Sequence, residues 1–210
     1  MRTSLGLLKT LSLGIALLAF LTLSAGVVRA DPVTFTTNGC FGAGCTPSIT
    51  STAFGTGNAT VVFTNQAPTT VDTSTPSGFT IADLGTFTVG GTGTFSSTPF
   101  VLQVVQSAPT PGSGVFGGTL TGTLIINGSD ARIIFNDTSL TIGLTTYQLG
   151  NLTNGNTLLL DPNATGGITR ITATITTIPE PATMLLLGTG LAGVAAKVRK
   201  RRKAKSDVEA

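Results

Sequence analysis

Acid–base chemistry in residues 31–178 would depend on aspartates, because the chain has no histidine and this stretch has neither glutamate nor lysine. Paired carboxylates hydrolyse glycosidic bonds, one as the acid and the other as base or nucleophile. The candidates stand where turns are expected: Asp130 and Asp137 flank the ends of a predicted hairpin, and Asp161 starts an Asp-Pro-Asn sequence. Aspartates at turns commonly accept hydrogen bonds from backbone amides. The sequence therefore predicts no catalytic site and no enzyme, with a secreted aspartate-dependent glycoside hydrolase as an alternative.

The same turns hold the hard oxygen atoms that calcium prefers as ligands. They come from Asp161 with Asn163, and from Asp130 with the pair Asn136-Asp137. The spacing of these residues matches no known calcium loop, and a chain without histidine lacks the usual nitrogen ligand of zinc. We therefore expect no metal and no cofactor.

Turn residues divide residues 31–178 into short segments that alternate as β-strands do. In the clearest segment, Ile171, Ala173 and Ile175 face one way and the intervening threonines face the other, which is typical of a half-buried strand. The expected strands are 33–37, 59–65, 79–81, 85–89, 100–106, a hairpin over 119–135 that turns at Asn127-Gly128, 139–142, 145–149, 157–160 and 168–178. Loops are expected at 66–78 and 108–114. The pattern predicts an all-β domain, an antiparallel β-sandwich of jelly-roll or immunoglobulin-like type.

After residue 178 come three stretches of different character. Pro179-Glu180-Pro181 favours an extended backbone, and the uncharged run 182–196 follows it. As a helix this run would be roughly 22 Å long, which is shorter than the bilayer core of about 30 Å. The basic residues after the run can snorkel, and a bilayer can thin locally. We therefore predict a transmembrane helix over 182–196, with a soluble buried helix as the alternative.

The stretch 197–203 sets the expected orientation in the membrane. Six of its seven residues are basic, namely Lys197, Arg199, Lys200, Arg201, Arg202 and Lys203. Lysine and arginine beside a membrane span stay on the cytoplasmic side. Residues 204–210 would then form a cytoplasmic tail, and residues 31–178 would lie outside the cytoplasm.

In this order and register, the three stretches resemble a PEP-CTERM sorting signal over residues 179–203. The resemblance rests on Pro179, Glu180 and Pro181, on the basic residues of 197–203, and on an apolar pattern of Leu185, Leu186, Leu187, Gly188, Gly190, Leu191 and Gly193. It implies that a polytopic membrane enzyme, exosortase, recognises the Pro-Glu-Pro region and processes the chain there. It also implies a Gram-negative host that makes extracellular polysaccharide. A plain membrane anchor is the alternative.

Residues 1–30 have the features of a secretory signal peptide. Arg2 and Lys9 are basic, 11–28 is apolar, and Ala30 precedes the expected cleavage point before Asp31. We therefore expect the Sec machinery and signal peptidase as partners, with an uncleaved amino-terminal anchor as the alternative.

Export bears on the state of the two cysteines. Cys40 and Cys45 enclose the glycine-rich sequence Phe41-Gly42-Ala43-Gly44, which can close tightly. An oxidising compartment favours disulfides. We predict a disulfide between Cys40 and Cys45, and a metal site there would need more ligands.

The overall net charge of +3 reflects the two ends of the chain, where the basic residues cluster. Between residues 31 and 178, Arg132 and Arg170 stand against six aspartates, which leaves a net charge of −4. This balance does not favour binding to an acidic polymer, and we expect no nucleic-acid partner.

Together these features predict an exported, non-enzymatic β protein of the cell surface or extracellular matrix. We expect it first in the inner membrane, with residues 31–178 outside the cytoplasm, and finally at the cell surface, in the outer membrane or in the matrix. An extracellular carbohydrate-binding module acting on exopolysaccharide is the alternative. Such modules usually stack sugars on exposed aromatic side chains, whereas this chain has no tryptophan and one tyrosine, Tyr147.

Overall fold

The computed structural model describes residues 31–48, 52–75, 77–125, 129–160 and 167–178, together with the single residues 190 and 193. The strands belong to one compact unit, Ala30–Ile178. Within the ranges just given, no helix has both the length and the apolar character needed to cross a membrane. The predicted signal peptide and almost all of the predicted transmembrane helix lie outside the described residues.

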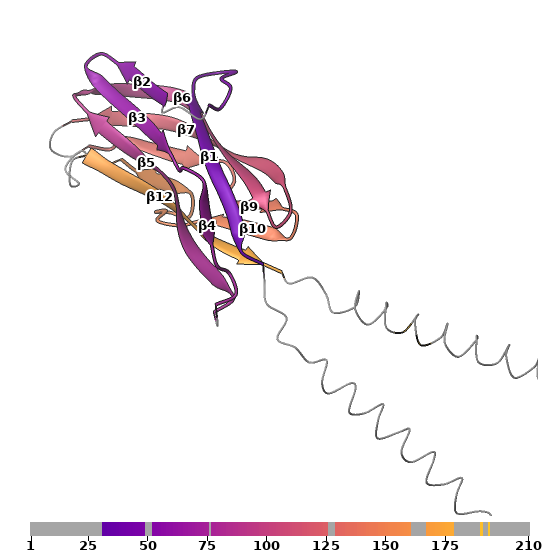
Figure 1. Cartoon of the computed structure of the whole chain (residues 1–210). Helices are drawn as coiled ribbons and strands as arrows, with labels where there is room; N and C mark the ends of the chain where they lie inside the picture. The colour runs from indigo at the N-terminus through magenta and orange to yellow at the C-terminus, as the bar shows by residue number, and fades with distance from the viewer. Residues whose placement is uncertain are drawn as a thin grey trace, which may run out of the picture. The chain divides into compact units, whose positions relative to one another are not determined.

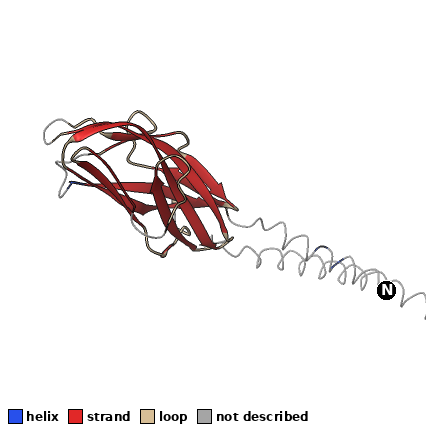
Figure 2. Cartoon of the chain, turned by 90° about the horizontal axis from the view of Figure 1, so that it is seen from above, coloured by secondary structure: helices blue, strands red, loops and turns tan. Residues whose placement is uncertain are grey.

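The described part of the chain forms twelve strands in two six-stranded sheets, and all neighbouring strands pair antiparallel (Figure 1). The first sheet has the order β11 (Thr157–Leu159), β8 (Arg132–Phe135), β7 (Gly112–Leu124), β6 (Gly93–Ala108), β1 (Val33–Phe41) and β4 (Thr69–Val71). The second sheet has the order β2 (Thr52–Thr56), β3 (Ala59–Asn65), β5 (Phe79–Gly90), β12 (Ile168–Thr177), β10 (Thr145–Leu149) and β9 (Ser139–Ile142). Figure 2 shows strands throughout this unit, and the all-β prediction is confirmed.

One hydrophobic core is shared by the two sheets, because alternate side chains of the strands turn inward. Its centre contains Phe63 and Phe87 from the second sheet and Phe100 from the first. The ring centroids are 4.9 Å apart for Phe63–Phe87, 5.4 Å for Phe63–Phe100 and 5.2 Å for Phe87–Phe100. Other fully buried side chains are those of Phe35, Phe95, Phe116, Phe135, Leu84, Leu102, Leu120, Leu124 and Tyr147.

Two glycines make room for the ring of Phe63. A Cβ atom on Gly39 would lie 2.3 Å from Cδ1 of that ring, and one on Gly85 would lie 2.5 Å from its Cζ. Gly85 also has a φ of +137°, a backbone conformation that side-chain-bearing residues rarely adopt. The central aromatic cluster therefore depends on glycine at both positions.

A buried polar link also joins the sheets. The Tyr147 hydroxyl on β10 donates a hydrogen bond to Oε1 of Gln106 on β6 at 2.7 Å, and Nε2 of Gln106 donates to the Thr110 carbonyl at 2.7 Å. Phe35 meets the tyrosine ring edge-on, with centroids 5.8 Å apart. Burial raises the pKa of the Tyr147 phenol above its ordinary value, because the phenolate would be poorly solvated.

The strands predicted at 79–81 and 85–89 are one strand, β5. Its pairing with β12 shifts register, because Ile171 lies opposite Gly85 and Thr172 lies opposite Asp83. Such a bulge inserts one residue without ending the strand. The alternation of apolar and polar residues breaks at this point, and the sequence therefore predicted two strands where the structure has one.

The loop predicted at 108–114 is shorter than expected. β6 and β7 pair from Gln106–Gly112 to Gly93–Leu124, and β7 then pairs with β8 only over Gly118–Thr121. The prolines and glycines of 108–114 are poor strand formers and therefore predicted a loop there, whereas β7 already begins at Gly112. The predicted turn Asn127-Gly128 lies outside the described residues.

The strands β2 and β4 were not predicted. Both lie at sheet edges, and β4 falls within the loop predicted at 66–78. Edge strands are often short and need less apolar alternation than central strands, so their sequence signal is weak. Their assignment depends on pairing with β3 and β1.

Candidate functional site

The last strand of the domain, β12, lies in the interior of the second sheet. It pairs with β5 on one side and with β10 on the other, with Thr176 opposite Phe79 and Thr177 opposite Thr145. The predicted alternation is confirmed, because Ile171, Ala173 and Ile175 are fully buried. The chain therefore reaches residue 178 from a strand that is fixed on both edges.

Thr73 forms hydrogen bonds with residues at both ends of the domain's chain, Asp31 and Thr177. Its hydroxyl donates to the carbonyl of Asp31 at 3.3 Å and lies 2.5 Å from the hydroxyl of buried Thr177. Because the Thr73 proton is directed at Asp31, the Thr177 hydroxyl is the donor in the second bond. The start of β1 and the end of β12 lie at the same end of the unit in Figure 1. We call this end of the domain the exit end.

Ile178 is the last residue before the Pro-Glu-Pro sequence, and its backbone is also held. Its amide donates to the carbonyl of Leu144 at 3.0 Å, while its side chain is exposed. Pro179 follows directly in the sequence. Three residues span at most about 11 Å when fully extended, so no more than that length of chain joins Ile178 to Pro181.

A family model identifies the sequence that follows β12: the PEP-CTERM protein-sorting motif matches residues 177–202. The chain carries a PEP-CTERM sorting motif. The motif implies export, membrane-associated sorting and processing by an exosortase-like membrane enzyme, as the resemblance suggested. The match begins at Thr177, so the PEP-CTERM motif starts at the last residue of β12. No curated protein and no solved structure matches the chain.

Most of the residues predicted to function in sorting lie outside the described part of the chain. These are Ala30, Pro179, Glu180 and Pro181, the leucines and Gly188 of the apolar pattern, and the basic residues of 197–203. Gly190 and Gly193 are described and are helical and exposed. Asp31 is exposed, and its carbonyl is the acceptor for Thr73.

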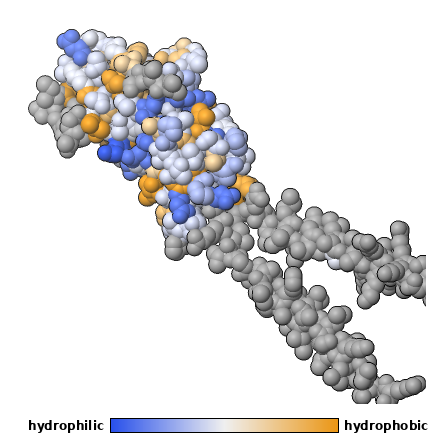
Figure 3. All heavy atoms as spheres, in the orientation of Figure 1, coloured by the Kyte–Doolittle hydropathy of each residue, from blue (hydrophilic) through white to orange (hydrophobic). Residues whose placement is uncertain are grey.

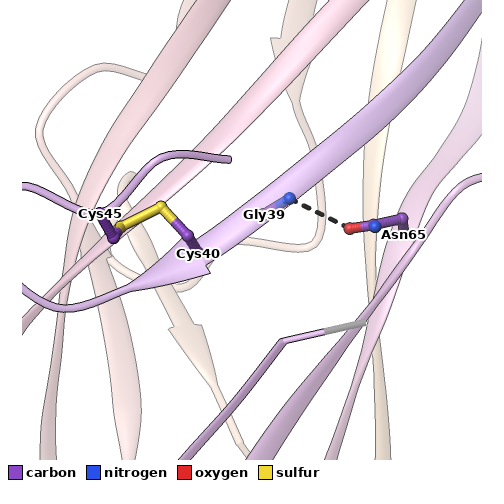
Figure 4. The surroundings of a disulfide bond; sticks show 4 residues. All are labelled: Gly39, Cys40, Cys45 and Asn65. Atoms are coloured by element: carbon purple, nitrogen blue, oxygen red, sulfur yellow. Dashed lines mark hydrogen bonds between the residues drawn. A yellow bond between two sulfur atoms is a disulfide. The ribbon is translucent and has the colours of Figure 1, made fainter. Parts of the chain in front are cut away.

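The two cysteines are joined in a disulfide, with an S–S distance of 2.02 Å, and Figure 4 shows its surroundings. This is the pair that the sequence analysis named. The following loop returns to β1, where Ser48 forms a bridge with Gly39. The Asn65 side chain accepts from the Gly39 amide at 3.0 Å and donates to the Ser48 carbonyl at 2.9 Å. The disulfide and Asn65 therefore hold this loop against the sheet.

Asp72, Asp83 and Asp130 bond to groups of the backbone or pair with arginine, whereas Asp137 is exposed. Asp130 accepts from the Thr123 amide at 2.5 Å, and Asp72 accepts from the amide and hydroxyl of Ser74 at 2.8 and 2.6 Å. Asp83 pairs with Arg170 at 2.6 Å on the exposed face of the second sheet. Among the described residues, no three acidic or cysteine side chains come together as a metal site would require. Asp161 and Asn163 lie outside those residues.

Sequence reasoning missed Thr73, Leu144 and Thr177 at the exit end. Thr73 lies 42 residues from Asp31 and 104 residues from Thr177, so no local pattern connects them. The stretch around Thr73 is also rich in threonine and serine, which conceals a single buried hydroxyl. Only the pairing of the strands shows that these residues meet.

We expect Thr73→Val to loosen the exit end. Valine keeps the volume but removes the hydroxyl that bonds Asp31 and Thr177, so the free energy of unfolding should fall by about 1–3 kcal/mol. Hydrogen exchange at the amide of Ile178 should also become faster. Urea unfolding can be followed by the emission of Tyr147, since the chain has no tryptophan and no other tyrosine. Thr176→Val, at an exposed position of β12, is the control, and equal behaviour of the two variants would contradict a role for Thr73.

Proposed function

We propose that the chain is an exported, non-enzymatic β protein of the cell surface or extracellular matrix. The observation that supports this proposal is the direct passage of β12 into the PEP-CTERM motif, which delivers the folded domain to the membrane. The motif acts after export, with residues 31–178 outside the cytoplasm. Pro179-Glu180-Pro181 is the region that an exosortase-like enzyme recognises, 182–196 spans the inner membrane, and 197–203 stays on the cytoplasmic side.

The domain is proposed to be a β-sandwich of jelly-roll or immunoglobulin-like type. Two antiparallel sheets that share one core support this assignment. Strands far apart in the chain are neighbours, such as β1 with β6 and β5 with β12, which is typical of Greek-key connections.

The non-enzymatic role is supported by the work that the aspartates already do. Asp72 and Asp130 each bind a backbone amide near their own position, and Asp83 is neutralised by Arg170. A hydrolase would need one carboxylic acid facing another across a substrate, at about 5 to 9.5 Å. The hydrogen bonds of these aspartates favour a role in turns and strands over the alternative of a glycoside hydrolase.

Burial of the aromatic rings argues against the carbohydrate-binding alternative. Seven phenylalanines and Tyr147 have at most 2% of their surface exposed. Within the described ranges, Phe79 is the one aromatic residue that is exposed. A sugar-binding platform would use several exposed rings, so exopolysaccharide binding by stacking is not favoured by this surface.

Mass spectrometry of the mature protein from its native host tests the proposal. We expect an amino terminus at Asp31, because signal peptidase removes residues 1–30, and a carboxyl terminus near Pro179-Glu180-Pro181 that lacks 197–210. The Cys40–Cys45 disulfide should appear as a mass two hydrogens below that of the reduced chain. A mature chain that keeps both 1–30 and 197–210 would contradict export and processing together.

A further inference from the structure

We infer that four exposed apolar residues at the exit end form a surface that contacts membrane lipid. This exit patch consists of Phe79, Ile81, Leu144 and Ile178, and the inference rests on the proposed function, in which the PEP-CTERM motif holds the domain at a membrane. It adds a lipid-contacting role for the folded domain itself. The patch would anchor and orient the domain on the bilayer next to the processing point.

The four residues are neighbours on one face of the second sheet. Phe79 lies opposite Thr176 and Ile81 opposite Thr174, on the two adjacent strands β5 and β12. Ile178 continues β12 and bonds Leu144 through the backbone. Thr80, between Phe79 and Ile81, lies opposite buried Ile175, so the alternation directs Phe79 and Ile81 outward.

The exit patch is unusual for its exposure. The exposed fractions are 42% for Phe79, 65% for Ile81, 38% for Leu144 and 62% for Ile178. In the described part of the chain eight large apolar residues are exposed in this way, and half of them are here. Single exposed apolar residues are ordinary, whereas a contiguous group marks an interaction surface. Figure 3 shows hydrophobic residues in orange at several places on the visible face of the domain, including this end.

The charge around the exit patch favours neutral lipid surface over an anionic partner. Thr174 and Thr176 separate the apolar side chains, and neither is charged. Asp83 is two residues from Ile81 on the same face and is paired with Arg170 at 2.6 Å. Asp31 and Asp72 are exposed at the exit end, so no net positive charge borders the patch. Contact would therefore depend on burial of apolar surface and not on attraction to acidic headgroups.

The position of the patch selects lipid as its occupant. Pro181 lies at most about 11 Å of chain from Ile178, and the apolar run 182–196 starts directly after it. The headgroup region adds roughly 5–8 Å on each side of the hydrocarbon core. A tether of this length keeps Ile178 and its neighbours within reach of the headgroup region, so lipid is present near the patch at high effective concentration.

The test uses the full chain reconstituted into phosphatidylcholine vesicles with brominated acyl chains, which quench nearby tryptophan. The chain has no tryptophan, so Ile81→Trp places a single probe in the exit patch. Ile168→Trp is the matched control, because Ile168 is also an exposed isoleucine of the second sheet and lies at the opposite end of β12, facing Thr88. We expect loss of emission and a blue shift for I81W, neither change for I168W, and no effect of added salt.

Each other outcome would overturn the inference. Unquenched emission from I81W, in vesicles that carry the chain on flotation, would refute the lipid contact and leave membrane-associated sorting intact. A blue shift without quenching would place protein, such as a second copy, on the patch. Failure of the chain to float with vesicles would instead refute the membrane tether of the proposed function. Far-ultraviolet circular dichroism before and after urea confirms that each variant is folded.

Discussion

Replacing Pro179, Glu180 and Pro181 together with alanine is expected to leave the chain unprocessed and retained in the membrane. All three residues lie within the matched motif, 177–202. The prolines supply no backbone donor and keep the segment extended, which is the form of a peptide that an enzyme can bind. Alanine is the best helix former, so the triple variant would remove the constraint that the prolines place on the backbone before the apolar run. A blot of the membrane fraction should show only the larger, unprocessed form.

Single changes separate the two features of the motif. Glu180→Gln removes the charge and keeps the shape, whereas Pro179→Ala keeps the charge and frees the backbone. Glu209→Ala is the matched control, because Glu209 is the other glutamate of the chain and lies beyond residue 202. Normal maturation of the triple variant would show that processing does not depend on Pro-Glu-Pro, whatever the single variants do.

The second large effect is expected in the core, where Phe63→Ala should lower the free energy of unfolding by about 3–5 kcal/mol. The ring of Phe63 contacts those of Phe87 and Phe100 and so joins the two sheets. Truncation leaves a cavity that the surrounding strands cannot close. Because small domains are stable by only about 5–15 kcal/mol, the variant should be close to unfolding at 37 °C. Urea unfolding followed by Tyr147 emission gives the value.

Two further variants make this prediction specific. Phe79→Ala removes the same ring from an exposed position and should change stability by less than about 1 kcal/mol. Gly39→Ala should destabilise by about 1–3 kcal/mol, because its Cβ would press on the Phe63 ring. Combining Gly39→Ala with Phe63→Ala should give less than the sum of the two losses, since the clash is removed. Additive losses would mean that the glycine does not make room for this ring.

Features that depend on neighbouring residues were predictable from the sequence. The alternation of isoleucine and alanine with threonine in β12 predicted its buried face, and the match to 177–202 confirmed the sorting signal. The disulfide joins cysteines separated by only five positions. In each case the physical cause operates over a few residues, so spacing alone carries the information.

Features that depend on pairing between distant strands were not predictable. The bulge at Gly85 is set by β12, more than 80 residues later, and it hid the continuity of β5. Glycines at 112–118 gave no strand pattern because pairing with β6, not propensity, fixes that part of β7. Neither Thr73 nor the exit patch has a local signal, since their members come from β5, β12 and the segments beside them. The contacts of Thr73 and the exit patch both arise from the register of the paired strands, which a single sequence does not reveal.

The place of β12 within its sheet has a consequence for the timing of folding. A chain that emerges across a membrane from its amino end presents β5 and β10 long before their shared neighbour. Until the residues of β12 have emerged, the second sheet is divided into β2-β3-β5 and β10-β9, with two open edges facing each other. Thr177 is both the last residue to close that gap and the first residue of the sorting motif. The strand that completes the second sheet therefore leads directly into the sorting motif.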